Sequence, residues 1–104
     1  MNITRRAMFQ KSAPVKDKGR LAAVAAMPCC VCSEFGMTQT SPTEVHHLIC
    51  GRFSQAKAGD DATIPLCRYH HRGPGGIHTI RAEWINSYGP DADWLEWTND
   101  RISE

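Results

Sequence analysis

Two short-spaced pairs of metal-ligating residues stand out in the sequence. Cys29 and Cys32 form a C-x-x-C pair, and Cys67 and His70 form a C-x-x-H pair. A gap of two residues lets the backbone turn so that both side chains point at one ion, and zinc prefers four nitrogen or sulfur ligands in a tetrahedron. We therefore predict a structural Zn²⁺ that closes residues 33–66 into one loop and adds folding free energy to a short chain. The alternative is four unconnected thiols and imidazoles.

The cysteine count supports metal ligation over disulfides. The chain has five cysteines, an odd number, and three of them crowd into residues 29–32. The N-terminal residues lack an apolar signal segment and no apolar run is long enough to span a membrane, so we expect a cytoplasmic protein, where disulfides are disfavoured. Cys30 is then a packed or spare thiol, and Cys50 a small core residue.

Four further histidines suggest a second kind of chemistry. His46 and His47 are adjacent in a segment typical of a strand, where neighbouring side chains point to opposite faces, so one can hold a metal while the other faces a water. His71 directly follows His70, whose zinc would position it rigidly, and His78 could return to the same place beyond a glycine-rich break. A neutral imidazole that accepts a proton, beside a divalent ion, suits hydrolysis of a phosphodiester.

Composition and periodicity predict the elements that position these residues. An alanine-rich stretch at 17–27 favours a helix, which Pro28 ends. Strands are expected at 44–49 and 63–66, with Pro65 confining the second to a sheet edge. The other expected elements are a cysteine turn at 29–32, a turn or helix at 67–72, a GPGG turn at 73–76, a helix at 77–88 and a short helix at 91–101. The aromatic residues of the last two favour core packing over base stacking: Trp84, Tyr88, Trp94 and Trp97.

Charge is unevenly distributed along the chain of 104 residues, although the net charge is only +1. Residues 1–20 carry six Lys and Arg against one acid, whereas residues 83–104 carry six acids against one base. The basic arm could lie along phosphates or could be a solubilising leader. Arg52 and Lys57 could bind a phosphate group of the substrate, or they could belong to a solvated loop.

These motifs together resemble a known family. The C-x-x-C pair (29–32), HHLICGR (46–52), IPLCRYHH (64–71), IH (77–78) and WINSYG (84–89) resemble phage-type HNH nucleases (His-Me finger, ββα-metal). The resemblance is closest to the Ref group, the RecA-directed recombination-enhancement nucleases. It covers residues 28–89, and the order of the elements makes it more specific than any single one.

The resemblance implies a role for each histidine. His47 matches the general base that activates water, and His46 the preceding metal-ligand position. His71 matches the ligand at the start of the metal-binding helix, and His78 a further ligand displaced by the GPGG insertion. No asparagine precedes the second cysteine element to orient the base, so Asp60, Asp61 or a backbone carbonyl would have to do so.

We therefore expect an α+β fold, a small ββα-metal finger stapled by structural Zn²⁺ with flanking helices. Residues 1–16 would be a flexible basic arm and residues 17–104 the HNH nuclease domain. The expected function is metal-dependent endonuclease cleavage of DNA, with a catalytic divalent ion at His46, His71 and His78. Imidazole ligands favour Zn²⁺, Mn²⁺ or Ni²⁺, although phosphate oxygens could recruit Mg²⁺.

Two other hypotheses remain open at this point. The chain could be a non-catalytic zinc-containing module that binds nucleic acid, or a structural fold that holds two zinc ions. The resemblance also implies a phage or prophage origin, a bacterial host cytoplasm and a recombinase filament as a partner.

Overall fold

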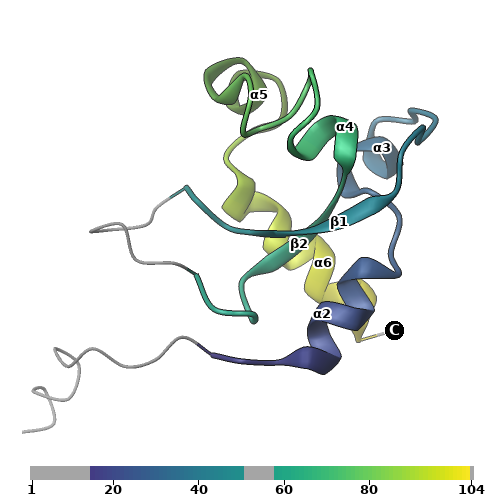
Figure 1. Cartoon of the computed structure of the whole chain (residues 1–104), viewed down its shortest axis with the longest axis vertical. Helices are drawn as coiled ribbons and strands as arrows, with labels where there is room; N and C mark the ends of the chain where they lie inside the picture. Colours follow the sequence, from purple (N-terminus) through teal and green to yellow (C-terminus); the bar gives the residue numbers. More distant parts are fainter. Residues whose placement is uncertain (1–14, 51–57, 104) are drawn as a thin grey trace, which may run out of the picture.

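The computed structural model describes residues 15–50 and 58–103. Figure 1 shows a two-stranded sheet surrounded by short helices. The elements in chain order are α2 (Lys18–Ala25), α3 (Cys30–Glu34), β1 (Thr43–His47), β2 (Thr63–Cys67), α4 (Arg68–His71), α5 (Arg81–Tyr88), the 3₁₀ helix η1 (Asp91–Trp94) and α6 (Leu95–Ile102). Arg52, Lys57 and residues 1–14 of the predicted arm lie outside the described residues.

The two predicted strands form an antiparallel hairpin. β1 and β2 pair from Thr43 opposite Cys67 to His47 opposite Thr63. β2 is buried along its whole length, and Pro65 is tolerated because both strands of a two-stranded sheet are edges. The hairpin therefore places the histidines of β1 at one end of the sheet and the last residue of β2 at the other.

Helices α2 and α6 contact the sheet, as Figure 1 shows. α2 begins after Asp17, whose side chain accepts a hydrogen bond from the backbone N–H of Arg20 (3.0 Å) and so caps the helix. The core combines residues of β2, such as Ile64 and Leu66, with Ile77 and Trp84. Trp84 is fully buried and Trp94 is buried, which confirms the prediction that these two aromatic residues pack in the core.

Two predicted elements differ in the structure. The predicted helix at 77–88 begins only at Arg81, because residues 77 and 78 donate their backbone N–H groups back to α4: Ile77 to the carbonyl of His70 and His78 to that of His71, each at 3.0 Å. The predicted cysteine turn at 29–32 is instead the start of the short helix α3. The first difference arises from contacts with α4 that local periodicity does not encode, whereas α3 begins with a local hydrogen bond from the Ser33 N–H to the Cys29 carbonyl (2.9 Å).

Among the described residues no helix is both long and apolar enough to cross a membrane.

A side chain on α2 joins three elements. The Arg20 guanidinium donates to the Thr63 hydroxyl (2.8 Å) and carbonyl (2.7 Å) and to Asn99 Oδ1 (2.7 Å), which connects α2 with β2 and α6. The Thr63 hydroxyl in turn donates to the carbonyl of Asp60 (2.9 Å).

We expect Arg20→Ala to lower the free energy of unfolding by about 2 kcal/mol, because hydrogen bonds from a charged donor are lost while alanine keeps the helix. Thermal unfolding followed by circular dichroism should show a Tm lower by roughly 10 °C. Lys18→Ala, an exposed cation on the same helix, is the control. Equal Tm values for the two variants would contradict the role given to Arg20.

Candidate metal centres

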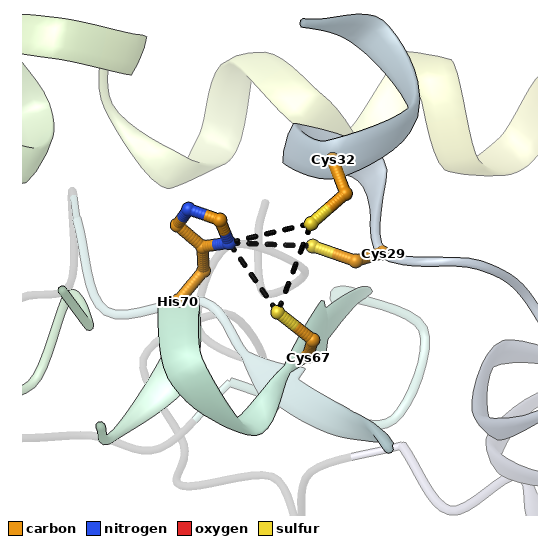
Figure 2. Close-up of side chains that lie close together, drawn as sticks. All are labelled: Cys29, Cys32, Cys67 and His70. Carbon is orange, nitrogen blue, oxygen red and sulfur yellow. Dashed lines mark hydrogen bonds between the residues drawn. The ribbon is translucent and has the colours of Figure 1, made fainter. Parts of the chain in front are cut away.

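Four buried side chains meet where α3 faces the start of α4. Figure 2 shows Cys29 and Cys32 on one side and Cys67 and His70 on the other, with their sulfur and nitrogen atoms converging. The ligand atoms lie within 4.8 Å of one another. The structure thus brings together the four residues predicted from the two short-spaced pairs.

The spacing of these atoms suits a tetrahedral ion. His70 Nδ1 lies 3.3 Å from Cys67 Sγ, 3.6 Å from Cys32 Sγ and 3.9 Å from Cys29 Sγ. Zinc with bonds of about 2.3 Å to sulfur and about 2.0 Å to nitrogen needs ligand atoms about 3.5–3.8 Å apart. The cluster could therefore hold a metal such as zinc with only small adjustments.

Burial sets the protonation of the cluster when no metal is bound. It raises the pKa of the Cys29 thiol and raises that of Cys32 to about 12, and it lowers the pKa of the His70 imidazole. The Cys29 and Cys32 thiols are then neutral at neutral pH, so a bound metal must displace their protons. Cys30 is also fully buried but is not part of the cluster, in agreement with its prediction as a packed thiol.

A second cluster consists of three imidazoles. His46 comes from β1, His71 from the end of α4 and His78 from the turn before α5, and their ligand nitrogens lie within 4.8 Å of one another. Their ring centroids are 4.9–5.2 Å apart. The hydrogen bond from the His78 N–H to the His71 carbonyl brings the third imidazole back past the glycine-rich turn.

A buried carboxylate fixes the orientation of His46. Asp91 accepts hydrogen bonds from His46 Nε2 (2.7 Å) and from the backbone N–H groups of Ile49 (2.8 Å) and Cys50 (3.1 Å). Burial raises the pKa of Asp91, but these hydrogen bonds outweigh burial and hold it at about 2. The carboxylate is therefore ionised, so His46 Nε2 carries the proton and Nδ1 keeps its lone pair.

The second ring nitrogen of His46 has an unsatisfied hydrogen-bonding requirement within the described residues. Nδ1 is buried, and the described residues offer it no hydrogen-bond partner. Burial also lowers the pKa of His46, which favours the neutral ring. A buried acceptor without a partner costs about 1–3 kcal/mol unless something else satisfies it. A metal ion shared with His71 and His78 fits this requirement.

His71 has a similar carboxylate partner. Its Nδ1 donates to Glu44 Oε1 (2.8 Å), and Glu44 also accepts from Arg72 Nε (2.9 Å) and Nη2 (2.7 Å). These hydrogen bonds, chiefly those from Arg72, lower the pKa of Glu44 to about 2. Because Nδ1 is occupied by Glu44, Nε2 of His71 is the nitrogen available to a metal. Carboxylates that hold the outer nitrogen of a ligating histidine are typical of metal sites.

His47 lies outside both clusters. Its Nε2 donates to Asp60 Oδ1 (2.9 Å), and its side chain is 39% exposed. The hydrogen bond from His47 and that from the backbone N–H of Asp17 (2.8 Å) lower the pKa of Asp60. Asp60 therefore orients the His47 ring through Nε2, and it is one of the groups considered from the sequence for this position.

Glu44 and Asp91 are site residues that sequence reasoning missed. Glu44 stands two residues before His46 on β1, so strand alternation could have placed both on one face. Asp91 lies 45 residues beyond His46, and no local pattern links the two.

The fold and these donor sets define a small α+β protein with a two-stranded sheet and a cysteine/histidine cluster that could bind zinc. The model of the family described as "Recombination enhancement, RecA-dependent nuclease" matches residues 13–92, most of the chain and both clusters. The chain therefore belongs to this family. Searches of curated proteins and of solved structures found no significant match.

Proposed function

We propose that the chain is a metal-dependent DNA endonuclease of the HNH, ββα-metal kind, in which β1, β2 and α4 form the finger. The observation that carries the proposal is the buried, unpartnered Nδ1 of His46 within a cluster of three imidazoles, one residue before the partly exposed His47, which pairs with Asp60. A structural site alone would not need a solvent-accessible imidazole beside it. Membership of a nuclease family supports the same activity.

His47 is the general base of this proposal. Asp60 holds the proton on Nε2, so Nδ1 accepts a proton from the attacking water. A divalent ion at His46, His71 and His78 would supply electrostatic stabilisation of the phosphoryl and leaving oxygens. Asp91 and Glu44 keep the inner nitrogens of His46 and His71 available to that ion.

The remaining parts of the proposal concern the substrate and partners. Residues 17–104 form the nuclease domain with a structural Zn²⁺ at Cys29, Cys32, Cys67 and His70. The basic arm of residues 1–16, together with Arg52 and Lys57, contacts DNA phosphates. The family description supports a RecA filament as the partner and recombination as the process.

Nicking of supercoiled plasmid tests this function. Metal-stripped protein would be reloaded with one equivalent of Zn²⁺ and then given Mg²⁺, Mn²⁺ or Ni²⁺, or more Zn²⁺, with and without a RecA filament. We expect nicking that requires the second metal. Folded protein that shifts plasmid on a gel but never cuts it under any of these conditions would contradict the proposal and favour the non-catalytic binding module.

Glu44→Gln should weaken the second metal site. The amide lacks the negative charge of the Glu44 carboxylate, to which both Arg72 and His71 donate hydrogen bonds. His71 is then held less firmly in the tautomer that leaves Nε2 available to a metal. We expect Mn²⁺ affinity, measured by calorimetric titration of zinc-loaded protein, to fall about 10–100-fold. Glu96→Gln, an exposed carboxylate on α6, is the matched control. Unchanged affinity in Glu44→Gln would refute the supporting role of Glu44.

A further inference from the structure

A cleft lies along the exposed side of α4, next to the cysteine/histidine cluster, since its residue Tyr69 directly precedes His70. Its volume is about 550 Å³, and its lining includes Thr40, Ser41, Arg68, Tyr69, Arg72 and Pro74. This volume lies in the usual range of small-ligand sites. The lining combines two guanidinium groups, the hydroxyl groups of Thr40 and Ser41 and the phenol ring of Tyr69. Arg72 also supports the histidine cluster through Glu44, whereas none of the lining residues is itself a member of either cluster.

The aromatic ring in this cleft is exposed but held in place. Tyr69 is 45% exposed, and its ring makes an edge contact with His70 at a centroid distance of 5.1 Å. The turn at 73–76 packs closely on the ring, since a Cβ at Gly75 would lie 2.4 Å from Tyr69 Cε2. The absence of a side chain at position 75 therefore permits this contact, and the turn fixes the orientation of an accessible tyrosine.

The cations of the cleft differ in their partners. Arg72 is neutralised by Glu44 (2.7 Å), whereas Arg68 makes no ion pair within the described part of the chain. Ser41 Oγ accepts a hydrogen bond from the backbone N–H of Tyr69 (3.0 Å), which leaves the Ser41 O–H able to donate. A fixed ring beside an unpaired guanidinium and a hydroxyl donor suits a base and its phosphate.

We propose that this cleft binds an unpaired nucleotide of single-stranded DNA, with the base stacked on Tyr69 and the phosphate contacted by Arg68 and Ser41. A duplex fits less well, because its base faces are already covered by neighbouring base pairs. Arg72 connects the cleft to the histidine cluster through Glu44 and His71, so the bound strand lies beside the second metal centre. The substrate class this implies, DNA with an unpaired segment, rests on the proposed nuclease function.

Fluorescence anisotropy with a labelled oligothymidylate and a matched duplex tests the cleft. The protein is zinc-loaded and no second metal is added, so that binding is measured without cleavage. We expect Tyr69→Ala to weaken single-strand binding about tenfold or more with an unchanged salt dependence, since a stacked base is lost but no charge is. Arg68→Ala should weaken binding and reduce the slope of log K against log salt by about 0.7.

Three further variants separate stacking from a change in folding. Tyr69→Phe keeps the ring and should bind within about twofold of wild type, whereas Gly75→Ala displaces the ring and should resemble Tyr69→Ala. Lys18→Ala removes an exposed cation far from the cleft in sequence and is the charge control for Arg68→Ala. Circular dichroism and zinc content should be unchanged in every variant that is compared.

Wild-type binding by Tyr69→Ala, or duplex binding at least as tight as single-strand binding, would overturn the inference. A loss in Tyr69→Phe as large as that in Tyr69→Ala would also overturn it, because the hydroxyl and not the ring would then carry binding. The two proposals can fail separately. If the protein nicks plasmid but its binding does not depend on Tyr69, only the proposal of a nucleotide-binding cleft is contradicted. If binding depends on Tyr69 but no nicking occurs, only the proposed nuclease activity is contradicted.

Discussion

Cys67→Ser should unfold the chain at 25 °C. Cys67 is the last residue of β2, it directly precedes α4, and its sulfur lies 3.3 Å from His70 Nδ1 and 3.9 Å from Cys32 Sγ. A structural zinc in small domains contributes about 10–16 kcal/mol of apparent binding free energy, as much as the whole stability of a typical domain. Losing one ligand should remove a large part of that free energy.

Circular dichroism and zinc content measured on the same sample check this prediction. Cys67→Ser should show little helix and much less than one equivalent of zinc, and a strong chelator should give the same spectrum with wild-type protein. Cys30→Ala is the matched control, because Cys30 is equally buried but lies outside the cluster. A folded, cooperatively melting Cys67→Ser variant without zinc would show that the cluster is not needed for folding.

His47→Ala should lower the rate of plasmid nicking by about 10²–10⁴-fold, the usual contribution of a general base. Its fold and metal content should be unchanged, because the His47 side chain is 39% exposed and belongs to neither metal cluster. The removed imidazole leaves a space open to solvent, so added imidazole should restore part of the rate in the variant.

The partner of His47 offers a graded comparison. Asp60→Asn keeps a hydrogen-bonding group but loses the charge that fixes the proton on Nε2, so its rate should lie between those of wild type and His47→Ala. Glu96→Gln provides the matched loss of a carboxylate on the exposed side of α6. A His47→Ala variant that nicks at the wild-type rate would remove His47 from the mechanism.

Local patterns predicted the parts of the fold that depend on local spacing. The two-residue gaps in the cysteine and histidine pairs constrain the backbone directly, so the four residues of the cysteine/histidine cluster can be grouped from the sequence alone. β1 and β2 were also predicted to within two residues at each end, from the β-branched residues and histidines of 44–49 and the segment TIPL at 63–66.

Contacts between distant segments could not be predicted in the same way. α5 starts later than expected because the backbone at 77 and 78 bonds to α4, and the same bonds bring His78 to His71. Asp91 reaches His46 only because η1 follows α5 and returns to the end of β1. That contact occupies Nε2 of His46 and leaves the buried Nδ1, which carries the functional proposal, as the nitrogen without a partner among the described residues.

The most direct test of two metal centres with separate roles is a metal titration that follows folding and nicking together. Metal-stripped wild-type protein and His47→Ala would receive Zn²⁺ to one equivalent and then Mn²⁺. We predict that the first equivalent restores the fold of both without cutting, and that Mn²⁺ then starts nicking by wild type alone. Full nicking at one equivalent of zinc, or equal nicking by His47→Ala, would contradict the account.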